Sequence, residues 1–315
     1  MELPKHLEPL VAGLVGAPSM TAADVAHETG VDRELARRLW QALGFPPVDD
    51  DVRLFTPADV TVLRVVRQLL ERERIEPAVV LQLARVMGRS LALIADAQVG
   101  ATGALWERRV PDAVTAFPAL SADIERVIGY VWRRHFLAAL LRRAASPAAA
   151  DRAVVVGFAD LVGFTAMSQA LDARDLAASV DRFEAIAYEH VPARGGRIVK
   201  MIGDEVMFAV DEGAFAADIA VALVEAHARN ADLPDVRVGL ASGPTLSWEG
   251  DLFGPTVNLA NRLVNFARPN TVLISDELGA QLRDDPRFAL RHLRPVNLQG
   301  IGRVRPWVLR RAHVA

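Results

Sequence analysis

The sequence of 315 residues predicts an α+β protein, with an all-α N-terminal half followed by a ferredoxin-like βαββαβ arrangement. Two observations carry this prediction. Residues 1–145 repeat the start and stop signals of helices, whereas apolar strand-like runs alternate with helical segments from residue 153 onward. Between the halves, 146–150 reads Ser-Pro-Ala-Ala-Ala and interrupts both patterns, so we expect domains at 1–145 and 151–315.

The first half shows helix boundaries at defined residues. Thr21 with Asp24 three residues later is typical of a capping box. Thr56 followed by Pro57 is typical of an N-cap with proline in the first helical position. Helices are expected over about 21–28, 32–43 and 56–74, with another starting at Pro77.

A last helix of this half is expected over 128–145. Its apolar side carries Phe136, Leu137, Leu140 and Leu141, and its other positions are rich in arginine. Because this helix is the only covalent route between the halves, we expect it to transmit conformational changes from one half to the other. A passive linker is the alternative.

The second half reads as strands alternating with helices. Strands are expected over about 153–160, 197–202, 205–210, 236–242 and 271–275, with helices over 170–189 and 214–229 and a closing strand pair at 291–298 and 305–311. Gly203-Asp204 provides the tight turn of the central hairpin.

Composition narrows the class of protein. Hydrophobic residues make up 51% of the chain, enough for a sizeable core, and the net charge of −3 argues against a dominant nucleic-acid partner. The chain has no cysteine, which excludes disulfides and thiolate metal sites.

The longest apolar tract, 79–106, is interrupted by Arg85, Arg89 and Asp96, a pattern that favours a buried pair of helices over a membrane span. Residues 1–18 lack the basic region and clean apolar core of a signal peptide. We therefore expect a cytoplasmic protein with no transmembrane segment.

The most informative stretch is 251–262, which reads Asp-Leu-Phe-Gly-Pro-Thr-Val-Asn-Leu-Ala-Asn-Arg. Gly254 and Pro255 end any preceding element and let a helix start. Asn258 and Arg262 lie four residues apart, so they share the face opposite the apolar one. An amide beside a planar guanidinium suits an anionic, oxygen-rich ligand, although an exposed helix surface explains the same pattern.

Two aspartates complete the candidate chemistry. Asp160 ends an apolar strand, and Asp204 sits in the hairpin turn. Each alone is explained by its local structure. As a pair, their carboxylate oxygens suit Mg²⁺ or Mn²⁺, which prefer hard oxygen ligands.

These three motifs, in this order, resemble the catalytic set of class III nucleotidyl cyclases. The family patterns are a strand F-x-D-(I/L)-x-G-F-T, a hairpin K-x-x-G-D and the segment D-x-(W/F)-G-x-x-V-N-x-A-x-R, and the resemblance covers about 151–312. The N-terminal half is similar, more loosely and without a residue motif, to the helical regulatory domain in front of some actinobacterial adenylyl cyclases.

The resemblance implies an adenylyl cyclase that converts ATP to 3′,5′-cyclic AMP and pyrophosphate. It implies that Asp160 and Asp204 hold two Mg²⁺ or Mn²⁺ ions, which in such sites lie about 4 Å apart. It further implies that Asn258 orients the ribose and that Arg262 stabilises charge on the α-phosphate in the transition state.

Lys200 and Asp251 match the family positions that read the purine. A lysine donor and an aspartate acceptor suit the ring nitrogen and amino group of adenine, whereas guanylyl cyclases commonly carry glutamate and a small polar residue there. A wrong pairing in a buried site costs several kcal/mol, so these residues favour ATP over GTP.

One position departs from the family pattern. Gln299-Gly300 stands where many members carry a lysine that contacts the triphosphate, so the charge is lost and only a hydrogen bond remains. Arg303 or Arg305 are candidates to compensate. In the family the two halves of each site come from different subunits, so the resemblance implies a homodimer.

The resemblance also implies regulation by the N-terminal half, through inhibition, response to pH or binding of a lipid or other small ligand. His135 on the 128–145 helix is the candidate proton sensor, because histidine changes charge near pH 6. The alternative function is a nucleotide- or DNA-binding regulator with weak or no cyclase activity, in which Arg33, Arg37 and Arg38 would form a recognition face. Three arginines beside an acidic loop are weak evidence for a DNA-binding surface, so DNA is not the expected partner.

Overall fold

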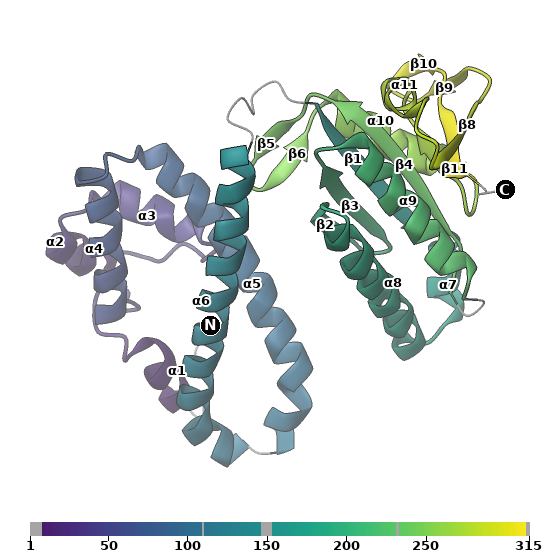
Figure 1. The fold of residues 1–315 in the computed structure, drawn as a ribbon. Coiled ribbons are helices and arrows are strands. Elements are labelled where there is room, and N and C mark those ends of the chain that lie inside the picture. The colour runs from purple at the N-terminus through teal and green to yellow at the C-terminus, as the bar shows by residue number, and fades with distance from the viewer. Residues whose placement is uncertain (1–7, 109, 146–152, 231–232, 313–315) are drawn as a thin grey trace. The chain divides into compact units, whose positions relative to one another are not determined.

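The computed structural model describes residues 8–108, 110–145, 153–230 and 233–312 (Figure 1). The chain divides into two compact units, Met1–Ser146 and Pro147–Ala315. Each unit has its own hydrophobic core.

Among the described residues of the first unit, the regular elements are all helices, joined by loops. Its helices are α1 Glu8–Val15, α2 Ala22–Thr29, α3 Arg33–Ala42, α4 Pro57–Glu71, α5 Pro77–Arg108 and α6 Val110–Ala145. The capping boxes expected at Thr21 and Thr56 are both formed. Packing of α3 against α5 buries Leu39, Leu81 and Ala84, which forms one core of this unit.

The long helices differ from the expectation. The tract expected to form a buried helix pair over 79–106 lies within one helix, α5, and several of its apolar side chains are exposed, Leu93 at 71%. The prediction of a buried pair was therefore wrong, because this tract continues as one helix and its described side chains Leu83, Met87 and Leu93 are exposed. Among the described residues one stretch, Pro77–Ala101, has the length and hydropathy of a membrane span, which for a single helix is weak evidence. Helix α6 starts at Val110, well before the expected residue 128.

The second unit is built on a seven-stranded sheet in the order β2-β3-β1-β4-β7-β11-β8. The strands are β1 Val154–Leu161, β2 Arg197–Ile202, β3 Glu205–Val210, β4 Val236–Gly243, β7 Val272–Ile274, β8 Phe288–His292 and β11 Trp307–Arg311. Strands β2, β3, β1 and β4 are antiparallel neighbours, and with α8 Ala173–Ala193 and α9 Gly213–Ala228 they form the predicted ferredoxin-like βαββαβ core.

Helices cover both faces of this sheet. On one face α8 and α9 lie side by side in Figure 1, and Phe183 and Ile219 pack against Ala159 of β1. On the other face α10 Pro255–Phe266 buries Ala260 and Val264 against Val156 and Phe158 of the same strand.

Helix α10 approaches β4 unusually closely at Gly239. A Cβ atom at this position would overlap the backbone of Ala260 and Val264, so only glycine allows the helix to sit this near the sheet. This close contact fixes the distance between the polar face of α10 and the strands of the sheet.

Two expectations for the second unit need correction. The helix expected over 170–189 is α8, but it begins at Ala173, because Asp172 caps it by accepting bonds from the amides of Arg174 and Asp175, and a short helix that was not anticipated, α7 Phe164–Ala170, precedes it. The closing strand pair is also wrong in part. Strand β11 pairs with β7 and β8, whereas β9 Val296–Leu298 forms a separate hairpin with β10 Gly302–Val304 around the left-handed turn at Gly300. Another small hairpin, β5 Leu246–Trp248 with β6 Asp251–Phe253, was not anticipated.

Candidate active site

The two aspartates lie together at one end of the central strands. Asp160 is near the end of β1, and Asp204 is in the turn between β2 and β3, where its carbonyl oxygen accepts a bond of 3.1 Å from the amide of Leu161. The β1–β3 register places Asp160 opposite Glu205. Three carboxyl groups from two chain segments therefore gather at this end of the sheet.

Arg237 of β4 provides the positive charge beside them. Its guanidinium donates to Oδ2 of Asp160 at 2.7 Å from Nε and makes an ion pair of 2.6 Å through the terminal nitrogen. It also donates to the carbonyl oxygen of Asn265 in α10 at 3.1 Å. The same side chain thus joins the carboxyl cluster to the helix above the sheet.

The negative charges are only partly compensated. Burial raises the pKa of Asp160, and the charge of Asp204 adds to this rise against the opposing effect of Arg237. Burial, followed by the charges of Asp160 and Asp204, raises the pKa of Glu205 from 4.5 to about 7. This cluster would be stabilised by an additional cation.

The donor set can be compared with what a hard divalent cation requires. No group of three or more His, Cys, Asp or Glu side chains is arranged as a metal site within the part of the chain that the structure describes. Two aspartates whose charge is only partly compensated by Arg237 nevertheless fit Mg²⁺, which is usually held by one or two carboxylates together with substrate phosphates. The residues present therefore fit a metal that arrives with its substrate.

Lys200 and Asp251 form a direct pair. Nζ of Lys200 in β2 lies 2.5 Å from Oδ2 of Asp251 in β6, although 51 residues separate them in the chain. The other oxygen of Asp251 accepts a bond of 2.8 Å from the amide of Leu252, which orients the carboxylate. A donor and an acceptor are thus placed side by side, both partly exposed.

Helix α10 presents its two predicted polar residues to solvent. It starts with Gly254 as N-cap and Pro255 in the first turn, as expected from the sequence. Asn258 and Arg262 are both exposed on the face opposite the buried Ala260 and Leu263.

Arg262 lies beside the segment that departs from the family pattern. Its Nε donates to the carbonyl oxygen of Gln299 at 3.1 Å. Arg303 and Arg305 are exposed and line a cavity of about 240 Å³ together with Leu259 and other residues. The guanidinium groups of Arg303 and Arg305, which follow Gln299 in the sequence, therefore lie close to α10.

Some predicted site residues remain apart. Within the described chain, neither Asn258 nor Arg262 hydrogen-bonds to Asp160 or Asp204. The single chain thus holds a carboxyl cluster and an exposed amide–guanidinium face with no direct bond between them.

Two residues of this region were missed by the sequence reasoning. Glu205 follows Asp204 directly, so its position next to a candidate metal ligand was a usable signal. Arg237 is 77 residues from Asp160, and only the β1–β4 register, which pairs these two positions, reveals their contact.

Comparison with known proteins agrees with this geometry. Residues 147–311 match the family described as the adenylate and guanylate cyclase catalytic domain, and residues 10–105 match the adenylate cyclase regulatory domain. An adenylate cyclase of Streptomyces coelicolor is 34% identical over 97% of this chain and 89% of its own length. An adenylate cyclase of Glutamicibacter nicotianae is 34% identical over 91% of this chain and 77% of its own length.

A pH-sensitive adenylate cyclase of Mycobacterium tuberculosis is 31% identical over 93% of this chain and 78% of its own length. The relatives thus match across both units rather than across the catalytic unit alone. This chain therefore belongs to the adenylate and guanylate cyclase family, and within it to the adenylate cyclases that carry an N-terminal regulatory domain.

Proposed function

We propose that this adenylate cyclase converts ATP to 3′,5′-cyclic AMP and pyrophosphate at sites shared between the two subunits of a homodimer. The observation that carries the choice of ATP is the Lys200–Asp251 pair, with its donor and acceptor 2.5 Å apart. Adenine offers a ring nitrogen that accepts and an amino group that donates, so one ligand edge satisfies both side chains.

In the reaction, the ribose 3′-oxygen forms a bond to the α-phosphorus as the bond to the bridging oxygen of pyrophosphate breaks, and the hydroxyl proton is released to water. Asp160 and Asp204 would hold the divalent cations. When bound, Mg²⁺ or Mn²⁺ supplies activation of the hydroxyl and charge compensation on the leaving oxygens. Asn258 orients the ribose, and Arg262 offsets the charge that develops on the α-phosphate.

Subunit sharing is supported by the separation of these groups within one chain. Asn258 and Arg262 face solvent on α10 and make no bond to the aspartates, whereas a second subunit would supply the missing half of each site. Arg303 and Arg305, which line a cavity together with Leu259 and Leu263 of α10, are proposed to contact the triphosphate in place of the lysine that Gln299 replaces.

The first test is formation of cyclic AMP from ATP and Mn²⁺ by the purified full-length protein. Asp160→Ala should lose at least about 100-fold in kcat, because phosphoryl chemistry depends on positioning and charge compensation. Asp211→Ala, which removes an exposed aspartate at the end of β3, is the matched control and should keep full activity. No turnover by the wild-type protein at any pH, together with retention on DNA, would favour the alternative of a DNA- or nucleotide-binding regulator.

The sharing of sites has its own test. Asp160→Ala and Arg262→Ala should each be nearly inactive, but a mixture should regain activity because a heterodimer contains one intact site. If subunit exchange is verified and no activity returns, the shared-site arrangement is refuted.

We further propose that the N-terminal unit regulates the enzyme and that the protein is cytoplasmic. Helix α6 carries His135, which is exposed, close to the stacked rings of Trp132 and Phe136. Deleting residues 1–145 should raise cyclase activity at neutral pH and flatten its pH dependence. An unchanged pH profile and unchanged activity per site in the truncated protein would contradict this regulation.

A further inference from the structure

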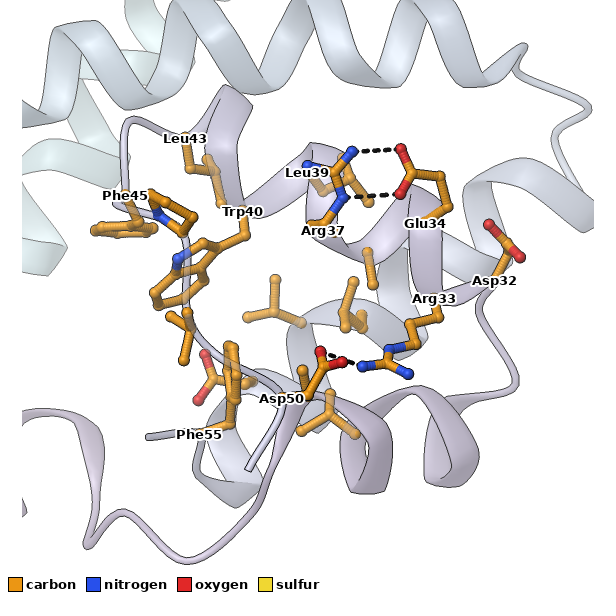
Figure 2. Close-up of a pocket in the computed structure, with 18 residues that line it drawn as sticks. Asp32, Arg33, Glu34, Arg37, Leu39, Trp40, Leu43, Phe45, Asp50 and Phe55 are labelled. Carbon is orange, nitrogen blue, oxygen red and sulfur yellow. Dashed lines mark hydrogen bonds and ion pairs between the residues drawn. The ribbon is translucent and has the colours of Figure 1, made fainter. Parts of the chain in front are cut away.

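The helical unit contains a hollow that the proposed catalytic function does not use. It has a volume of about 690 Å³ and lies between α2, α3, α4 and the connection from residue 43 to 56 (Figure 2). Cavities of a few hundred to about 1,000 Å³ with mainly apolar linings are typical of small-molecule sites. Buried or partly buried apolar side chains such as Val25, Leu39 and Leu63 form its floor.

Aromatic rings form one wall of this hollow. The ring of Trp40 lies 4.3 Å from that of Phe45, at a tilt of 35°, and 5.0 Å from that of Phe55, edge to face. Nε1 of Trp40 already donates to the carbonyl oxygen of Pro46 at 2.7 Å. The wall therefore offers flat apolar surface and has no free indole donor for a polar ligand.

The two arginines at the edge are already neutralised. Figure 2 shows Arg37 joined to Glu34 by two hydrogen bonds, of 2.7 and 2.5 Å, and Arg33 joined to Asp50 by an ion pair. An anionic ligand would have to displace a carboxylate from one of these pairs.

The two remaining carboxylates of the lining are also engaged. Asp32 accepts a bond of 2.9 Å from the amide of Leu35 as the N-cap of α3. Asp59 accepts bonds from the amide and hydroxyl of Thr56 at 2.8 and 2.9 Å as part of a capping box. Every charged side chain that lines the hollow thus has a partner within the protein.

The connection across the hollow is held in a way that permits entry. Residues 44–54 form no helix or strand, and Phe55 is attached to Met20 by two backbone bonds of 3.0 Å. The Arg33–Asp50 pair ties this connection to α3, and both side chains are more than half exposed. Exposed ion pairs contribute little to stability, so this tie can open at small cost while a ligand enters, and Asp50 can pair with Arg33 again once an uncharged ligand is bound.

From the apolar floor, the aromatic wall and the internally paired charges, we propose that this hollow binds an uncharged, ring-containing apolar molecule. The rings of such a ligand stack on Trp40 and Phe55, and no charge has to be matched. A carboxylate or sulfonate on the same ring system would meet four carboxylates and no free cation.

The test uses two fluorescent probes that share a ring system and differ by one charged group. N-phenyl-1-naphthylamine is neutral, and 8-anilinonaphthalene-1-sulfonate carries a sulfonate in addition. The full-length protein should bind the neutral probe at one site per chain, at least about tenfold more tightly than the anionic one, because burying an unpaired anion is costly. Equal or tighter binding of the sulfonate would overturn the assignment.

Substitutions then locate the bound probe. Ala36→Phe fills the hollow and should weaken binding of the neutral probe at least about tenfold. Val62→Phe narrows the rim of the hollow and should also weaken binding of the neutral probe. Because the Val62 side chain is 57% exposed, this variant keeps the test valid if Ala36→Phe does not fold. Val65→Phe, on the same helix, 52% exposed and outside the lining, is the matched control and should bind as the wild type does.

Unchanged binding by correctly folded Ala36→Phe and Val62→Phe proteins would place the probe on another apolar surface and refute the proposal. Because the readout is probe fluorescence, this result is independent of whether the proposed cyclase reaction occurs.

Discussion

Glu205 should make the stability of the metal-free protein fall as the pH rises. Its carboxyl lies partly buried beside Asp160 and Asp204, and these surroundings raise its pKa from 4.5 to about 7. In the unfolded chain the group ionises at its ordinary value. Between the two values the folded protein therefore binds more protons than the unfolded chain, so the free energy of unfolding decreases with increasing pH.

The size of this effect follows from the two pKa values. Each pH unit between them corresponds to about 1.4 kcal/mol, which gives a full penalty of about 3 kcal/mol above pH 7. Solvent reaches part of the side chain, and screening lowers this to about 2 kcal/mol. The stabilisation is complete below pH 4.5 and is lost as the pH passes 7.

The assay is urea unfolding of the full-length protein in EDTA, at a series of pH values from 5 to 8. Wild-type stability should fall by about 2 kcal/mol more than that of Glu205→Gln over this range. The comparison isolates Glu205, because histidines such as His227, whose pKa is lowered chiefly by burial, contribute with the opposite sign in both proteins. Glu212→Gln, at the exposed N-cap of α9, is the control and should follow the wild-type curve.

Parallel curves for wild type and Glu205→Gln would refute the charge cluster as described. Adding Mn²⁺ should flatten the wild-type curve, because a bound cation offsets the charges that raise the pKa of Glu205.

Three further predictions follow from close contacts in the catalytic unit. Gly239→Ala should push α10 away from the sheet at Ala260. The melting temperature measured by calorimetry should fall by about 5–10 °C, and kcat measured by cyclic AMP formation should fall about 100-fold. Lys200→Glu combined with Asp251→Cys should lower kcat/KM for ATP at least about 100-fold and raise the GTP-to-ATP ratio, whereas an unchanged preference would remove both residues as purine readers. Arg237→Gln should cost about 1–3 kcal/mol in thermal unfolding without metal, since a half-buried carboxylate loses its partner, and Mn²⁺ should restore part of the loss. A variant as stable as wild type in EDTA would show that the ion pair contributes nothing.

Local signals predicted the element boundaries well wherever a chemical group acts within a few residues. The capping boxes at Thr21 and Thr56 and the hairpin turn at Gly203-Asp204 are where the sequence places them. A side chain that satisfies an amide three residues away, or a glycine that adopts a left-handed turn, needs no other part of the chain. The same reasoning explains the start of α10 at Gly254-Pro255.

Local signals failed where distant elements decide the outcome. The pairing of β11 with β7 and β8 was not readable, because strand partners are chosen by the whole sheet. The exposure of α5 likewise depends on how many elements pack around it, which its own hydropathy does not encode.

The candidate active site shows the same difference between features set by local sequence and features set by contacts between distant elements. The sequence by itself determined which residue types are available and where they sit on their elements, including Asp160 at a strand end and Arg262 on the polar face of α10. Only the tertiary structure decided that Lys200 meets Asp251 and that Arg237 meets Asp160, contacts that span 51 and 77 residues. The physical reason is that ion pairs and burial arise between elements, so their energies exist only once the sheet order has brought those elements together.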